Sequence, residues 1–89
     1  MSDKPYYLYM IQCVDKSIYT GITTDVGRRI SQHNKGTASK YTRTRRPVRL
    51  LVSYLVGNRS DASKEEYRVK KLRRSKKLKL IKRIKNVQK

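Results

Sequence analysis

The side chains best suited to acid–base or metal chemistry in this chain are few. They are three tyrosines, an arginine, the only histidine and two adjacent glutamates: Tyr7, Tyr9, Tyr19, Arg29, His33, Glu65 and Glu66. Histidine exchanges a proton near neutral pH, arginine holds anions through a planar fork, and a carboxylate can bind a divalent cation. Each residue alone also has a structural explanation, because strand tyrosines pack in cores and glutamates form surface ion pairs.

Several common catalytic patterns are absent from the sequence. It has no glycine-rich phosphate loop, no His-Glu-x-x-His pair and no serine in a nucleophile elbow. With one histidine and Cys13 as the sole cysteine, neither an imidazole-rich metal site, nor a cysteine-based zinc site, nor an internal disulfide can form. Because a lone cysteine suits a reducing compartment, we expect a soluble, cytoplasmic protein.

The charge of the chain indicates a polyanionic partner. Its 89 residues include 24 Lys or Arg and 6 Asp or Glu, a net charge of +18. This charge repels itself unless a polyanion offsets it, so nucleic acid is the expected partner. A membrane surface is the weaker alternative, because the basic C-terminal segment lacks the Trp and Phe anchors of interfacial helices. No small-molecule cofactor is expected.

Two β-strands must position the tyrosines. Residues 6–14 (YYLYMIQCV) and 18–23 (IYTGIT) are rich in aromatic and branched residues, and the polar residues between them predict a hairpin. Alternation places Tyr7, Tyr9 and Ile11 on one face of the first strand and Tyr6, Leu8 and Met10 on the other. Both faces are partly apolar, so we expect each to be covered. A third strand, residues 48–56 (VRLLVSYLV), is apolar enough to be the central one.

A helix predicted from about residue 25 to residue 34 must position the histidine. At 100° per residue, Arg29 and His33 fall on the same narrow arc as Val26 and Ile30. A purely structural helix would place apolar residues there, so this arc is a candidate for function.

The glutamates lie on a second predicted helix, from about Asp61 to Arg73. Helical spacing lets either Glu65 or Glu66 approach the sheet. Ser75 can cap a third helix in a basic C-terminal tail, about residues 75–89. The order β-β-α-β-α-α predicts a single domain over residues 1–89 of the α/β or α+β class, built on a small, largely antiparallel three-stranded sheet.

Two basic segments are the expected nucleic-acid-binding surface. Residues 35–47 have no apolar periodicity and are predicted to form an exposed loop, and residues 68–89 hold 12 of the 24 basic residues and no acid. The side chains expected to contact phosphates are Lys35, Lys40, Arg43, Arg45, Arg46, Lys70, Arg73 and Arg74. Part of the tail can instead be a solvated face that only keeps the protein soluble.

The ordered motifs together resemble those of the GIY-YIG nuclease superfamily, and most closely its small stand-alone bacterial proteins. The likeness runs from PYYLYMIQC through IYTGITTDVGRRISQHN and SKYTRTRRPVRL to NRSDASKEEYRVKKL, which is nearly the whole chain. A triplet such as YTG is weak alone, but its spacing from YLY and from the later Glu-Tyr pair is specific.

The resemblance implies roles for the matching residues. Tyr9 takes the place of the tyrosine that closes the first triplet, and Tyr19 that of the tyrosine that opens the second, with Gly21 as its glycine. Arg29 matches the catalytic arginine of the family. His33 falls where family members have a histidine or a tyrosine.

The resemblance also implies a metal site. Glu66, directly before Tyr67, matches the single metal-binding glutamate, which implies one Mg²⁺ or Mn²⁺ ion that keeps several waters. A tyrosine is a poor base at neutral pH, so we expect Tyr9 to act as one only where a nearby cation or the metal favours its phenolate. His33 could relay the proton.

Two hypotheses for function follow. The first is a metal-dependent endonuclease that hydrolyses phosphodiester bonds in DNA, in repair or recombination, as the resemblance implies. The second is a binding module for DNA or RNA that keeps the nuclease fold without turnover. It is supported by the large charge and by one departure, since this chain has Leu78 where many family members carry an asparagine after the metal-binding glutamate.

Overall fold

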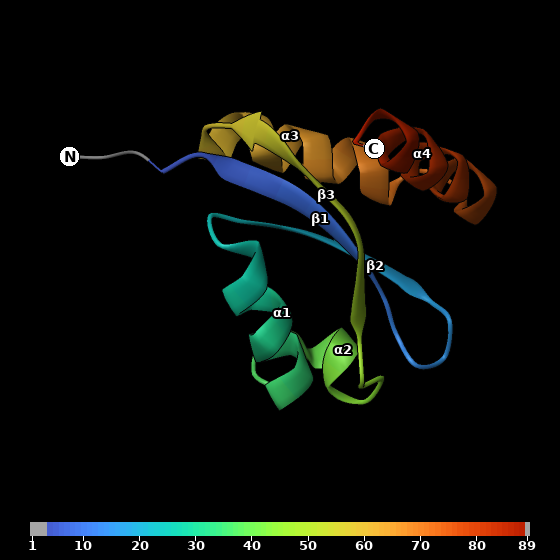
Figure 1. The fold of residues 1–89 in the computed structure, drawn as a ribbon. Coiled ribbons are helices and arrows are strands. Elements are labelled where there is room, and N and C mark those ends of the chain that lie inside the picture. Colours follow the sequence, from blue (N-terminus) through green and yellow to red (C-terminus); the bar gives the residue numbers. More distant parts are fainter. Residues whose placement is uncertain (1–3, 89) are drawn as a thin grey trace.

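A computed structural model describes residues 4–88 as an antiparallel three-stranded sheet between two layers of helices (Figure 1). In chain order the elements are β1 (Tyr6–Gln12), β2 (Ile18–Thr23), α1 (Val26–Lys35), α2 (Lys40–Arg43), β3 (Arg49–Gly57), α3 (Arg59–Lys70) and α4 (Arg74–Val87). This confirms the α+β class and the predicted order, to which the structure adds the short helix α2.

The spatial order of the strands is β2-β1-β3, so β1 is the central strand. The prediction that the third strand would be central is wrong. β1 is buried continuously from Leu8 to Ile11, whereas β3 leaves Leu50 and Leu55 about half exposed at 42% and 58%. The apolar content of a strand therefore did not reveal its position, because an edge strand covered on one face by helices can be as apolar as a central one.

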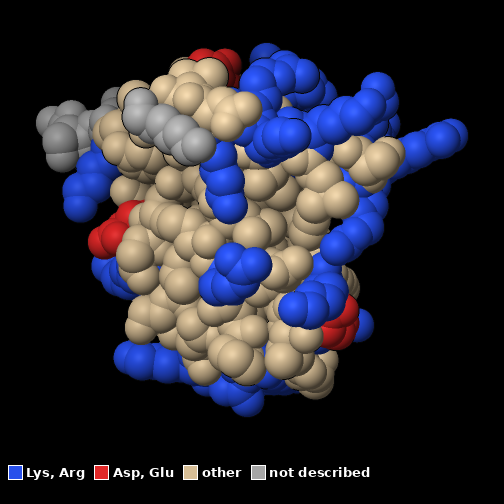
Figure 2. All heavy atoms as spheres, turned by 45° about the vertical axis from the view of Figure 1, so that its right-hand side comes forward, with Lys and Arg blue, Asp and Glu red and all other residues tan. Residues whose placement is uncertain are grey.

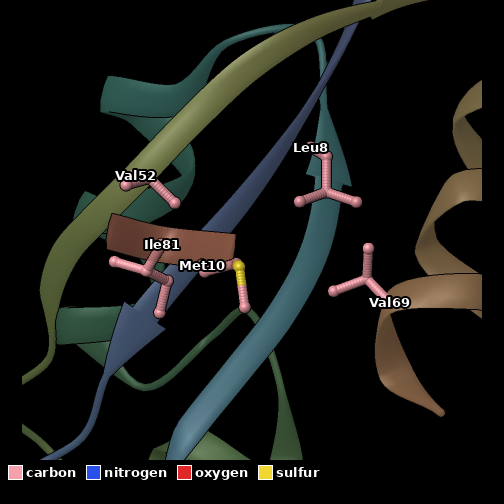
Figure 3. Packing of buried hydrophobic residues seen from close by; sticks show 5 residues of the cluster. All are labelled: Leu8, Met10, Val52, Val69 and Ile81. Atoms are coloured by element: carbon pink, nitrogen blue, oxygen red, sulfur yellow. The ribbon is translucent and has the colours of Figure 1, made fainter. Parts of the chain in front are cut away.

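One face of β1 carries an entirely apolar core. Leu8 and Met10 pack with Val52 of β3, against Val69 of α3 and Ile81 of α4 (Figure 3). All five side chains are at most 6% exposed. This cluster fixes α3 and α4 on one side of the sheet. Within residues 4–88, none of the helices combines the length and the apolar character needed to cross a membrane.

The opposite face of β1 carries a second cluster, covered by α1. Tyr9 and Ile11 are buried here, and Val26 and Ile30 of α1 pack against them. His33, one turn further along α1, is 1% exposed. Both predictions from periodicity are confirmed: alternation divides β1 between two covered faces, and the histidine shares the arc of the apolar anchors.

The connection after α1 differs from its prediction. Asp25 caps the start of α1, and Gly36 ends it with a φ of 83°. Residues 35–47 were predicted as an exposed loop, but part of this segment folds into α2, capped by the side chain of Ser39. Thr42 of α2 is 0% exposed. The loop prediction fails because a polar residue can be buried when a partner satisfies its hydroxyl.

The last two helices also begin and end at different residues from those predicted. α3 is capped by Asn58 and ends at Lys70, earlier than expected. α4 begins at Arg74 with no side-chain capping bond, so the predicted cap at Ser75 is wrong. A helix anchored by buried side chains such as Ile81 can begin without a cap, because packing outweighs the loss of one hydrogen bond.

Candidate active site

The side chains of Tyr9 and His33 meet on the α1 face of the sheet. The Tyr9 hydroxyl lies 2.8 Å from Nε2 of His33, and the two residues are 2% and 1% exposed. Their rings meet edge to face with centroids 5.7 Å apart. A strand and a helix that are 24 residues apart in sequence thus bring a phenol and an imidazole into a buried hydrogen bond.

The neighbouring strand β2 supplies the second tyrosine and the room for the first. Gly21 stands directly opposite Tyr9 in the β1–β2 register. A Cβ atom at this position would lie 2.5 Å from the Tyr9 hydroxyl oxygen, so only glycine lets the ring lie across β2. The Tyr19 ring meets the imidazole of His33 from another side, with centroids 5.3 Å apart. The two tyrosines therefore flank one histidine.

Burial controls the protonation of this group. It raises the pKa of Tyr9 well above the ordinary value, and the charges of Tyr19 and Glu66 add to the rise, while Arg29 opposes it. Arg29 alone therefore does not favour the phenolate, because burial outweighs the half-buried Arg29. The expectation that a bound metal would favour it stays a prediction. Burial, assisted by Arg29, lowers the pKa of His33. At neutral pH the pair is a phenol beside a neutral imidazole.

Helix α3 brings a carboxylate and an ammonium to the same region. Lys70 Nζ lies 3.3 Å from Glu66 Oε2 and 5.7 Å from the centroid of the Tyr19 ring. Tyr19 thus contacts His33 of α1 as well as Lys70 of α3. The Glu66 charge also acts on Tyr9. These contacts bring together four of the five residues predicted to be catalytic, and the fifth, Arg29, acts on Tyr9 and His33 through its charge.

The two glutamates, which helical spacing could not distinguish, have different surroundings. Glu65 accepts a hydrogen bond of 2.6 Å from the Tyr54 hydroxyl and bonds of 2.9 and 2.8 Å from Arg68. These bonds, those from Arg68 above all, lower the pKa of Glu65 to about 2. Glu65 therefore ties α3 to β3, while Glu66 lies beside Tyr19 and Lys70.

The surroundings of Glu66 fit a hydrated divalent ion rather than a protein-enclosed one. Within residues 4–88 no three His, Cys, Asp or Glu side chains form a group that could hold a metal. The Glu66 side chain is 25% exposed, which leaves room for water on an ion bound there. Mg²⁺ and Mn²⁺ accept such a site, with one carboxylate and several waters. Lys70 occupies one side of the carboxylate and would have to move aside.

Two residues of α2 join this site, and the sequence analysis identified neither. Thr42 Oγ1 lies 2.7 Å from Nδ1 of His33, the ring nitrogen that does not face Tyr9. The Tyr41 ring stacks on Tyr19 with centroids 5.8 Å apart. The Ser39 cap was a usable sequence signal for a helix here. The burial of Thr42, however, depends on a contact with α1 that no local pattern contains.

The eight basic residues predicted to contact phosphates fall into two groups. Three are already engaged: Arg45 pairs with Asp15 at 3.0 Å and lies 4.0 Å above the Tyr41 ring, Arg46 donates to backbone carbonyls, and Lys70 pairs with Glu66. The rest are exposed on the surface: Lys35, Lys40, Arg43, Arg73 and Arg74. Figure 2 shows lysine and arginine side chains gathered in the upper right of one face, with acidic side chains only at isolated points.

Comparison with known proteins connects this arrangement to a family. Residues 5–79 match the GIY-YIG catalytic domain. A UPF0213 protein of Staphylococcus haemolyticus is 46% identical over 76 residues, which cover 85% of this chain and 93% of that protein. A UPF0213 protein of Staphylococcus aureus is 44% identical over 77 residues, which cover 86% of this chain and 94% of that protein. Among solved structures, the UPF0213 protein BH0048 of Bacillus halodurans is similar with 45% identity and a TM-score of 0.57, covering 86% of this chain and 82% of its own. The E. faecalis protein EF2693 has 40% identity and a TM-score of 0.58, covering 86% and 83%.

Proposed function

The chain belongs to the GIY-YIG catalytic domain family, and from this premise we propose that it is a metal-dependent endonuclease that hydrolyses phosphodiester bonds in DNA. The observation that carries the proposal is the buried hydrogen bond of 2.8 Å between Tyr9 and His33. A phenol joined to a neutral imidazole can pass on a proton without ever becoming a stable phenolate. Water must lose a proton to attack a phosphate, and this pair supplies the acceptor.

The residues of the site have complementary tasks in this reaction. The Tyr9 oxygen takes a proton from the attacking water while the original Tyr9 proton moves to Nε2 of His33. The proton lost by water therefore ends on Tyr9, and the imidazole gains the former Tyr9 proton. Arg29 is suited to hold non-bridging phosphate oxygens, because its fork donates several hydrogen bonds and stays charged. Tyr19, packed edge to face against His33, keeps the ring in place.

Glu66 is the residue proposed to hold the metal. A bound Mg²⁺ or Mn²⁺ would neutralise charge on the phosphate and help the 3′ oxygen depart. Lys70, 3.3 Å from Glu66, would then be released from the carboxylate and would be free to contact a phosphate of the strand.

The basic surface supports a nucleic acid as the substrate, and we propose DNA as that substrate, with repair or recombination in the cytoplasm as the setting. Exposed cations such as Lys40 and Arg43 contact phosphates without reading bases. The charge of +18 favours binding with little sequence choice. We therefore propose that the structure of the nucleic acid, rather than its sequence, selects the site of cleavage.

Two observations favour the binding module as a second candidate. The Lys70 ammonium already neutralises Glu66, as a metal ion would. In addition, Leu78, which takes the place of the asparagine of many family members, is 45% exposed and offers no ligand. A protein that binds DNA or RNA through the same surface but does not cut it would have these features.

A cleavage assay separates the two candidates. The purified protein is incubated with supercoiled plasmid, a branched DNA and an RNA of matching sequence, with Mg²⁺, Mn²⁺ or EDTA. The Arg29→Ala variant is compared with Arg28→Ala, a control at the adjacent, exposed position. The endonuclease proposal predicts cutting that needs the metal, with only Arg29→Ala losing it. Binding by all proteins with no cutting would establish the binding module instead.

A further inference from the structure

A chain of three hydrogen bonds runs from β1 through α1 into α2. The Tyr9 hydroxyl meets Nε2 of His33 at 2.8 Å, and Nδ1 of His33 meets Thr42 Oγ1 at 2.7 Å. Thr42 Oγ1 in turn lies 3.4 Å from the carbonyl oxygen of Ser39 and donates to it. The members Tyr9, His33 and Thr42 are each at most 2% exposed, so these bonds are shielded from bulk solvent.

Counting hydrogens along this chain distinguishes the two neutral forms of the imidazole. A threonine hydroxyl has one hydrogen and can also accept. If Thr42 donates to the Ser39 carbonyl, its oxygen accepts from Nδ1–H of His33, and Nε2 is left with a lone pair for the Tyr9 proton. If instead Thr42 donated its hydrogen to Nδ1, Nε2 would carry the ring hydrogen and donate it to the Tyr9 oxygen. The Tyr9 hydroxyl hydrogen would then find no acceptor among residues 4–88.

We propose that Thr42 is a positioning residue that holds His33 in the Nδ1–H tautomer and so leaves Nε2 free to receive the proton of Tyr9. The use of that proton in hydrolysis rests on the proposed nuclease function. Thr42 is 0% exposed and acts only through the histidine. Fixing the tautomer of a histidine through its second nitrogen is a common way to tune a proton acceptor.

The construction of α2 supports this role. The helix has only four residues, and the Ser39 side chain caps it by accepting the Tyr41 N–H. Arg45 fastens its end to the hairpin turn through Asp15 at 3.0 Å. These contacts hold Thr42 in place although the surrounding segment has no apolar periodicity.

The other groups that face His33 are compatible with a neutral ring. They are Tyr9 from β1, Tyr19 from β2, the charge of Arg29 from α1, and Thr42 from α2. No carboxylate within residues 4–88 bonds the imidazole, so nothing there favours a doubly protonated ring. A hydroxyl that accepts from Nδ1 orients the ring without adding charge.

The test uses the fact that His33 is the only histidine. In the intact protein labelled with ¹⁵N-histidine, a long-range ¹H–¹⁵N spectrum at pH 8 reports the tautomer of this one ring. We expect the Nδ1–H form in the wild type and in Thr42→Ser, which keeps the hydroxyl. In Thr42→Val we expect that the Nδ1–H tautomer is no longer the only form in the spectrum. We also expect kcat to fall about 10- to 100-fold, with KM little changed. Thr44→Val, an exposed change of the same kind, should alter neither.

The inference is overturned if the wild type shows the Nε2–H form, or if folded Thr42→Val keeps the Nδ1–H form. Should Thr42→Val fail to fold, the wild-type and Thr42→Ser spectra decide, because each must show Nδ1–H. The tautomer is read without substrate or metal. A wild type in the expected tautomer that cuts no nucleic acid would therefore contradict the nuclease proposal and leave the role of Thr42 in the histidine tautomer intact.

Discussion

The two faces of β1 are equally buried but chemically opposite. On one, Leu8 and Met10 join a wholly apolar cluster with α3 and α4. On the other, Tyr9 is hydrogen-bonded to His33, which is hydrogen-bonded to Thr42. Buried polar groups cost free energy unless they are paired, so the second face is tolerated because each of these groups has a partner.

The contrast shows how a small protein separates stability from chemistry. The apolar face needs only hydrophobic side chains of suitable volume. The polar face needs particular hydrogen-bonding atoms, such as the Tyr9 hydroxyl and the two ring nitrogens of His33. Helix α3 serves both, since Val69 packs on Leu8 while Glu66 and Lys70 lie beside Tyr19. Substitutions on the two faces should therefore have effects of different kinds.

The largest expected effect is the loss of one hydroxyl from the polar face. Tyr9→Phe removes the group proposed to pass the proton, and we expect the cleavage rate to fall about 10²- to 10⁴-fold. Tyr54→Phe is the matched control, because Tyr54 packs at the apolar face and donates its hydroxyl to Glu65. Single-turnover cleavage and thermal melting of both variants are compared. If Tyr9→Phe and Tyr54→Phe lost the same share of the cleavage rate, the two faces would not differ in their role in catalysis.

A truncation on the apolar face should act on stability instead. Leu8 is 0% exposed, so Leu8→Ala should lower the free energy of unfolding by about 2–5 kcal/mol, through lost burial and a cavity. Leu55→Ala, at a residue 58% exposed, should change it by no more than about 0.5 kcal/mol. Urea denaturation measures both. At a temperature where Leu8→Ala is still folded, its cleavage rate should match that of the wild type.

A smaller effect is expected where the two strands of the hairpin meet. Gly21→Ala would place a methyl group 2.5 Å from the Tyr9 oxygen, so the ring must move and its hydrogen bond to His33 is disturbed. We expect a loss of about 1–3 kcal/mol in stability from overpacking. The diagnostic result is a change in the His33 imidazole signals. Gly27→Ala, near the start of α1, where the added Cβ would lie 3.8 Å from Asp25 Oδ1 at ordinary contact distance, should leave these signals in place. Unchanged signals in Gly21→Ala would refute the close approach.

The smallest effect is a dependence on pH. Burial and Arg29 lower the pKa of His33 below the unfolded value of 6.5. The folded state then binds this proton less readily, so the stability is complete above pH 6.5 and is lost as the pH falls toward the folded pKa. Melting temperatures of the wild type should fall between pH 7 and pH 5 more steeply than those of His33→Gln. Parallel curves would show that the ring titrates as freely as in the unfolded chain.

Periodicity predicted much of this site because the relevant neighbours are close in sequence. Alternation assigned Leu8 and Tyr9 to opposite faces, and helical spacing placed His33 beside Ile30. The resemblance to a known family selected Glu66, and the bonds of Glu65 to Tyr54 and Arg68 give a structural reason for that choice.

Other features depend on contacts between distant segments and could not be predicted in this way. The central position of β1 follows from pairing with two strands, one of them more than 35 residues away. Arg45 was expected to bind phosphate, but its charge is taken by Asp15, 30 residues earlier. The burial of Thr42 follows from a hydrogen bond to α1. A basic or polar residue in a sequence does not show which partner it will meet.

We propose that hydrolysis takes place beside Glu66 with a metal bound there, and substitution of the two adjacent glutamates is the sharpest test. Single-turnover cleavage of DNA in Mg²⁺ is measured for the wild type, Glu66→Gln and Glu65→Gln. Loss of a metal ligand removes several kcal/mol of transition-state stabilisation, so we predict at least about a hundredfold slower cutting by Glu66→Gln. Glu65→Gln should cut nearly as fast as the wild type while melting at a lower temperature. Equal cutting by both variants, or a loss confined to Glu65→Gln, would contradict the account.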